Sequence, residues 1–239
     1  MLAANAFFTW RSSGAFDPTL FADESANNLT ITRNGTPVRT TNTPFSGSGR
    51  SATFNGTTDS LTVANSNTLD TNSSFTLEVW FNYTTTGGGL ACIYDRGGGA
   101  PSSWSSSNGR AIILFQLSGT LYIQWQITGS NVAQLSVASP AINTWHHLVC
   151  GFNGTTMRGW LNGTSIGTST SLPVVPTTRN LIRVGMQTDA SAGYFPGQIS
   201  NLRFVSADVY GVGNSTITVP TSPLTAIANT QLLLGFNLP

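Results

Sequence analysis

The sequence predicts an all-β protein folded as one domain over residues 1–239. Apolar residues recur at every second position in several segments, Asn-Gly dipeptides separate such segments, and no stretch sustains the 3.6-residue period of a helix. A chain of 239 residues that is 39% hydrophobic can bury a sizeable core, and a β-sandwich of this length is routinely a single domain. The Gly- and Ser-rich stretch 87–110 is interrupted by short strand patterns, so we interpret it as a contact loop and not as a linker.

Two strands carry the clearest alternation. Residues 75–81, FTLEVWF, place four apolar side chains on one face and Thr76, Glu78 and Trp80 on the other, and residues 120–127, TLYIQWQI, alternate in the same way. Asn-Gly favours tight type I′ turns, so residues 29–40 and 158–167 are predicted antiparallel hairpins. The best helical candidate is a turn or two in residues 16–25, where Asp17 could cap and Pro18 could begin the helix.

The chain ends and the cysteines give three further expectations. The apolar segments 5–10 and 231–236 are expected to be neighbouring strands. Cys92 and Cys150 could pair, but both lie in apolar alternation, which favours buried free thiols. The first residues lack the pattern of a secretory signal, and no apolar run is long enough to span a bilayer, so we expect a product that is soluble where it is made.

The charge composition limits the partners. Only 8% of residues are charged, the net charge is +1, and all ten basic residues are arginines. Without a basic cluster, neither nucleic acid nor a membrane surface is an expected partner. A surface of Ser, Thr, Asn and Gly with a net charge near zero permits self-association, so a homo-oligomer is expected.

No catalytic residue is predicted. His146 and His147 are adjacent on an expected strand, where neighbouring side chains point to opposite faces, so they cannot serve one site. Glycoside hydrolysis needs two carboxyl groups facing one sugar, and Glu78 has no acidic neighbour on its face, while Glu24 lies in a loop.

No cofactor is expected. Calcium is the one metal considered, since carboxylates in turns can bind it; turn aspartates are at positions 59, 70, 95 and 189, with Asp59 and Asp95 as the candidates.

The loop 96–110 contains the clearest candidate contact residue. Trp104 is surrounded by small polar residues, so it could stack on a sugar or anchor a partner chain, or fold back onto its own domain. Arg96 and Arg110 flank this loop, and Tyr194 is a further aromatic residue in a loop. These four residues are the predicted ligand or partner contacts.

Three segments carry a resemblance to a known superfamily. Residues 144–167, TWHHLVCGFNGTTMRGWLNGTSIG, resemble a Trp-His-His strand and Asn-Gly hairpin of the concanavalin A-like, laminin G-type jelly-roll domains. Residues 51–81 resemble the early strands of these domains, and residues 193–236 resemble their closing strand, although Pro196 stands where relatives usually have Asp or Thr. Residues 21–35 and 220–227 are similar to segments of the copies found in tailed-bacteriophage virion proteins.

The resemblance implies two antiparallel sheets packed face to face, with sugar- or protein-binding loops at the rim. Relatives often bind calcium there, but this chain has no convincing acidic pair at matching positions. The leading hypothesis is a non-enzymatic structural protein of a phage virion, made in the host cytoplasm and placed on the virion surface as a capsid decoration or short fibre-like appendage in contact with other virion proteins. The alternative is a carbohydrate-binding module for host adsorption, and the third is a glycan hydrolase.

Overall fold

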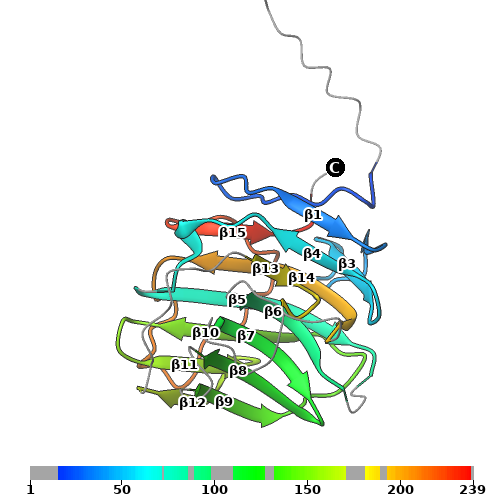
Figure 1. Ribbon diagram of the computed structural model, residues 1–239. Helices are drawn as coiled ribbons and strands as arrows, with labels where there is room; N and C mark the ends of the chain where they lie inside the picture. The colour runs from blue at the N-terminus through cyan, green and yellow to red at the C-terminus, as the bar shows by residue number, and fades with distance from the viewer. Residues whose placement is uncertain are drawn as a thin grey trace, which may run out of the picture.

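The computed structural model describes residues 16–71, 73–85, 89–97, 110–126, 132–170, 181–188 and 193–237. In this part of the chain, two antiparallel β-sheets face each other, which confirms the predicted all-β sandwich (Figure 1). The seven-stranded sheet has the order β1 (Ile31–Asn34), β4 (Ser60–Val63), β13 (Leu181–Val184), β6 (Ala91–Gly97), β7 (Arg110–Leu117), β8 (Thr120–Gln126) and β9 (Val132–Ala138). The eight-stranded sheet has the order β12 (Thr164–Ser169), β11 (Met157–Leu161), β10 (His146–Phe152), β5 (Phe75–Tyr83), β14 (Pro196–Val205), β3 (Ser51–Asn55) and β2 (Val38–Thr40), and β15 (Thr230–Leu234) also pairs with β14.

The interior lies between the sheets and follows the predicted alternation. Phe75, Leu77, Val79 and Phe81 of β5 are fully buried there, opposite Leu121, Ile123 and Trp125 of β8. The ring of Phe75 stacks on Phe204 with centroids 5.5 Å apart and also contacts Trp125 and Phe152, so aromatic side chains from both sheets meet at this point. Cys92 and Cys150 are buried free thiols, as predicted, and burial raises the pKa of Cys150.

Strand β5 is buried on both faces, whereas the sequence predicted one buried face. The covering segment, residues 206–229, lies over the outer face of the eight-stranded sheet. The Thr76 hydroxyl donates to the Ala207 carbonyl at 2.8 Å, and Val212 packs against Val149 and Trp160. A segment more than 120 residues away in the sequence therefore gives the polar face of β5 its own buried layer.

The Asn-Gly turns have two different outcomes. The hairpin predicted for residues 158–167 is confirmed as β11 and β12, with positive φ at Asn162 (49°) and Gly163 (82°). The hairpin predicted for residues 29–40 is wrong, because β1 pairs with β4 in one sheet while β2 pairs with β3 in the other. The Asp59 carboxylate accepts a hydrogen bond from the Thr36 N–H at 2.7 Å, which holds the turn as a crossing between sheets.

The helical turns expected near Asp17 do not form. The Asp17 carboxylate accepts from the Thr19 N–H at 2.8 Å and caps a single turn, and the chain then runs alongside β15, with the Glu24 N–H donating to the Leu233 carbonyl. Of the predicted strand 231–236, residues 231–234 belong to β15, pair with β14 and lie beside the described start of the chain, while residues 5–10 lie outside the described residues. The one helix in the described part is a 3-10 turn, Asn67–Leu69, and no helix there could cross a membrane.

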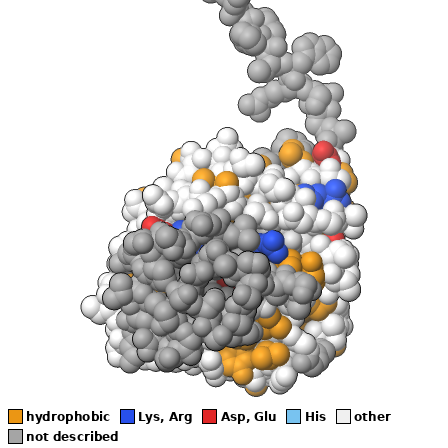
Figure 2. Space-filling view, viewed as in Figure 1, with side chains coloured by type: hydrophobic (Ala, Val, Ile, Leu, Met, Phe, Trp, Pro, Cys, Tyr) orange, Lys and Arg blue, Asp and Glu red, His pale blue; other side chains and the backbone are white. Residues whose placement is uncertain are grey.

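The surface matches the composition. On the described part of the face shown in Figure 2, uncharged polar side chains and backbone predominate, with few acidic or basic groups. Several arginines are directed inward, including Arg39 and Arg203, which are 2% and 6% exposed. Contacts of the described surface are therefore governed mainly by hydroxyl and carboxamide groups.

Candidate functional site

A groove of about 500 Å³ opens on the outer face of the eight-stranded sheet, where β3, β14 and β5 lie side by side. This volume is within the range of small-ligand sites. Carboxamides predominate among the polar side chains that line it. The lining residues are Asn42, Thr53, Phe54, Asn55, Asn82, Thr84, Asn143, Pro196, Gly197 and Gln198.

Strand register aligns the central residues of the groove. Gln198 of β14 pairs with Thr53 of β3 on one side and with Asn82 of β5 on the other. On β10, His146 pairs with Phe81; Trp145 directly precedes this strand, and continuing the register by one residue places it opposite Asn82. Directly paired side chains of neighbouring strands lie on the same face, so β3, β14 and β5 present Thr53, Gln198 and Asn82 as one row, and Trp145 follows at its end. We call these four residues the polar row.

Hydrogen bonds connect the polar row to the loop above it. The side-chain oxygen of Gln198, Oε1, accepts a hydrogen bond from the side-chain amide of Asn42 at 2.6 Å. The side-chain nitrogen of Gln198, Nε2, donates to the Thr53 hydroxyl at 3.3 Å. The Trp145 indole N–H is 3.5 Å from the Asn42 side-chain oxygen. Asn82 is 9% exposed, and its buried Oδ1 has no hydrogen-bond partner among the described residues. The groove therefore combines side-chain amides that are fixed by hydrogen bonds with a buried acceptor, Asn82 Oδ1, that lacks a donor among the described residues.

The arrangement suits a neutral ligand rich in hydroxyl groups. A side-chain amide offers both donors and an acceptor, which matches hydroxyl groups that also donate and accept. Trp145 is half-buried, and an indole beside amides can supply an apolar surface with a polar edge. No carboxyl, imidazole or guanidinium group is among the ten lining residues, all of which are described. Those residues can therefore bind a ligand, but they include no side chain that usually serves as a catalytic acid or base.

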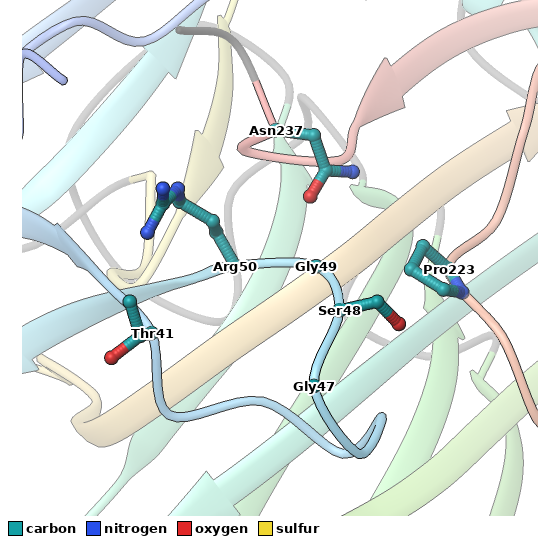
Figure 3. A pocket seen from close by; sticks show the side chains of 7 residues that line it. All are labelled: Thr41, Gly47, Ser48, Gly49, Arg50, Pro223 and Asn237. Atoms are coloured by element: carbon teal, nitrogen blue, oxygen red, sulfur yellow. The ribbon is translucent and has the colours of Figure 1, made fainter. Parts of the chain in front are cut away.

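A second hollow, of about 520 Å³, adjoins the same chain segment, since Thr41 lines this hollow and Asn42 lines the groove. It is lined by Thr41, Gly47, Ser48, Gly49, Arg50, Pro223 and Asn237. Figure 3 shows the Arg50 guanidinium directed away from the Ser48 hydroxyl and the Asn237 amide. Phe16 covers this guanidinium, with 3.9 Å between the Arg50 Cζ atom and the ring centroid. The polar groups of this hollow do not converge, so the groove is the stronger candidate site.

The predicted contact residues lie away from the groove or outside the described residues. Trp104 lies outside the described residues, and Arg110 begins β7 but its side chain is not described. Tyr194 is half-buried in the segment before β14, two residues from Pro196 at the groove. Arg96, predicted as a ligand or partner contact, is 1% exposed and donates to the Asp70 carboxylate at 2.7 Å, so its side chain is buried in an ion pair.

The calcium candidates Asp59 and Asp95 are both buried. Asp59 precedes β4 and accepts backbone hydrogen bonds from Thr36 and Asn55. Asp95 lies in strand β6 and not in a turn, and it accepts from the Thr188 N–H at 2.8 Å. Of the other two aspartates considered, Asp70 pairs with Arg96, and position 189 is outside the described residues. Within the described ranges, no three His, Cys, Asp or Glu side chains lie close enough together to bind a metal ion.

Glu78 is at the centre of a buried network beneath the covering segment. One carboxylate oxygen accepts from Arg203 Nε and Nη2 at 2.8 and 2.6 Å, and the other accepts from the Tyr210 hydroxyl at 2.7 Å and lies 3.2 Å from His147 Nε2. Burial alone would raise the pKa of Glu78, but these partners hold it below its ordinary value. His146 is on the opposite face, against Phe81 and the Asn162 amide, as its position in the strand predicts.

Sequence reasoning missed the residues of the groove. Asn82 continues the outward alternation of Thr76, Glu78 and Trp80, so this one position could have been found from the strand pattern. Thr53 and Gln198 are 145 residues apart and become neighbours only through β3–β14 pairing, which no local pattern specifies.

A family model described as the concanavalin A-like lectin/glucanases superfamily matches residues 55–208. The chain belongs to this superfamily. The laminin G-type resemblance is thereby confirmed; the match does not address the phage-type segments 21–35 and 220–227. No curated protein sequence is significantly similar to this chain.

Solved structures with a similar fold include binding domains of botulinum neurotoxins. The binding domain of botulinum neurotoxin serotype C1 has a TM-score of 0.61 and 12% identity over 81% of this chain and 47% of that chain. The serotype D/C VPI 5993 binding domain has a TM-score of 0.59 and 13% identity over 79% of this chain and 46% of that chain. A third structure has a TM-score of 0.58 and 11% identity over 80% of this chain and 48% of that chain; it is described by the dependence of botulinum neurotoxin type C on two ganglioside molecules for cell entry. This chain spans just under half of the toxin chains, and identity this low establishes similarity of fold alone.

Proposed function

We propose that this protein is a carbohydrate-binding module whose ligand occupies the groove on the eight-stranded sheet. The polar row carries this proposal, because strand pairing places Thr53, Gln198 and Asn82 side by side, and Trp145 and Gln198 both contact Asn42. Rigid strands hold binding groups more accurately than loops do. A sugar placed here would meet amides along its hydroxyl edge and an indole beside it.

Two further observations support this proposal. The superfamily includes lectins by its description, and a toxin with a similar fold is described with gangliosides, which are glycolipids. The uncharged lining of the groove also matches the chemistry of a sugar. This proposal corresponds to the alternative hypothesis of the sequence analysis, in which the module would serve host adsorption.

We expect the full chain to bind a subset of glycans on an array, and Gln198→Ala to weaken that binding. Gln198 is central to the polar row, and a hydrogen bond that it makes to a ligand contributes about 1 kcal/mol. Loss of one or two such bonds would raise the Kd by about tenfold. Isothermal titration calorimetry with the strongest array ligand measures this change, and Trp145→Ala is expected to weaken binding in the same direction.

Gln134→Ala is the matched control, because Gln134 is an exposed amide on β9 of the other sheet. This variant should bind like the unmodified chain, and all variants should keep their circular dichroism spectra. Equal losses for Gln198→Ala and Gln134→Ala, or saturable binding that neither Gln198→Ala nor Trp145→Ala affects, would exclude the groove as the site. Absence of binding to every glycan would contradict the proposed function.

We further propose binding without cleavage. Glu78, the glutamate considered for hydrolysis, is fully buried, and its carboxylate oxygens are occupied by Arg203, Tyr210 and His147. The bound glycan is therefore expected to remain intact on prolonged incubation. A reducing-end assay checks this, and release of reducing ends that Glu78→Gln abolishes would favour the hydrolase alternative.

Placement on a phage virion surface, as a decoration or short appendage, is a separate proposal. It is supported by the similarity of residues 21–35 and 220–227 to virion segments and by a surface suited to packing among other copies. We expect the protein in the mass-spectrometric inventory of purified particles from the phage that encodes it. Its absence from those particles would contradict this placement and leave the groove proposal unaffected.

A further inference from the structure

We propose that the groove selects uncharged glycans and discriminates against sugars that carry a carboxylate, such as sialic or uronic acids. This inference rests on the proposed function and specifies its ligand class. It separates this chain from the toxin described with gangliosides, which are acidic glycolipids.

The first observation is the absence of a compensating charge. None of the ten lining residues is Arg, Lys or His. Moving a carboxylate out of water is costly unless a cation or several strong donors replace its hydration. A hydroxyl group loses far less hydration and recovers it from a single amide, so a neutral sugar enters this groove at lower cost.

The second observation concerns an acceptor at the centre of the groove. The Gln198 side-chain oxygen accepts one hydrogen bond, from the Asn42 amide, and can accept a second. A carboxylate can only accept hydrogen bonds, so its oxygens would be repelled by this oxygen. A sugar hydroxyl or N-acetyl N–H group can donate to it.

The third observation is that neighbouring guanidinium groups are directed elsewhere. Arg203 is bound to Glu78, and Arg39 is buried and donates to the Asp17 and Phe236 carbonyls. Arg50 has no carboxylate partner in the described part of the chain, but it lines the second hollow beneath Phe16. Of these three arginines, Arg50 is therefore the one at which an acidic sugar would be expected, and it does not line the groove.

Matched ligand pairs test the inference by calorimetry on the full chain. Each neutral oligosaccharide that binds is compared with the same oligosaccharide bearing a terminal sialic acid or with its terminal hexose replaced by the uronic acid. We expect at least a tenfold weaker affinity for the acidic member. The affinity for the neutral member should not change between low and high salt, because no charge pair contributes to it.

Two variants test whether the groove is the place where neutral and acidic glycans are distinguished. Gln198→Arg should reduce the preference for the neutral member by adding a cation to the groove, whereas Arg50→Gln should leave both affinities unchanged. Equal or tighter binding of acidic glycans, especially if Arg50→Gln abolishes it, would overturn this inference while the proposed function still holds. Failure of every neutral and acidic glycan to bind would instead overturn the proposed function.

Discussion

Arg203→Met is expected to lower the free energy of unfolding by about 3–5 kcal/mol, because it leaves the Glu78 carboxylate buried without its cation. Both side chains are almost fully buried, so water cannot replace the lost partner. For a domain of this size the change corresponds to a decrease in Tm of about 10 °C. Urea denaturation followed by tryptophan fluorescence measures the loss.

Two controls separate the charge effect from lost packing. Arg158→Met removes a half-buried guanidinium that donates to the Val212 carbonyl and the Ser165 hydroxyl but has no carboxylate partner among the described residues, so it should cost less stability than Arg203→Met. The double variant Glu78→Gln with Arg203→Met should be more stable than Arg203→Met alone, because the uncompensated charge is gone. Additive effects of the two substitutions would contradict the central role of the ion pair.

The difference in stability between the unmodified chain and Arg203→Met should depend on pH in one direction. In the unmodified chain the pKa of Glu78 is lowered, so its contribution to stability is present above the unfolded-state pKa and is lost as pH falls through the folded-state value. In Arg203→Met the carboxylate has lost its cation and becomes protonated more easily. The stability difference between the two proteins should therefore shrink as pH is lowered from 7 towards 4, and a constant difference would contradict this explanation.

Phe75→Ala should destabilise the fold by about 3–5 kcal/mol, the usual range for removing a fully buried phenylalanine. Phe75 contacts Phe204 and Phe152 of its own sheet and Trp125 of the opposite sheet, so the substitution opens a cavity where the two sheets meet. Thermal unfolding followed by circular dichroism measures the effect. Phe75→Leu is the matched control and should cost much less, because it keeps most of the apolar volume. Equal losses for both substitutions would show that cavity size is not the cause.

Local patterns determine strands and turns well in this chain, but they do not determine which strands pair. Alternation correctly predicted the inner face of β5, and Asn162-Gly163 correctly predicted a hairpin. The same dipeptide at Asn34-Gly35 instead joins strands of different sheets, because the turn geometry is set locally whereas the partners of β1 and β2 are set by contacts with β4 and β3.

The two most informative polar clusters depend on distant segments. Glu78 looked like an outward-facing side chain, and only the covering segment, through Tyr210, together with Arg203 of β14, makes it the centre of a buried network. The groove combines Thr53, Asn82 and Gln198 through non-consecutive strand pairing. Composition indicated a nearly uncharged surface of Ser, Thr, Asn and Gly, but the location of the groove required the strand order.

The most direct test of the groove is a titration monitored by the side-chain amide resonances of the protein. The neutral glycan that binds most tightly is added to isotopically labelled full chain, with assignments confirmed by single substitutions. The amide signals of Asn42, Asn82, Asn143 and Gln198 should shift together and saturate, while those of Asn237 at the second hollow and Gln134 on β9 stay unchanged. Saturating shifts at Asn237 or Gln134 without shifts at Asn82 and Gln198 would contradict the account.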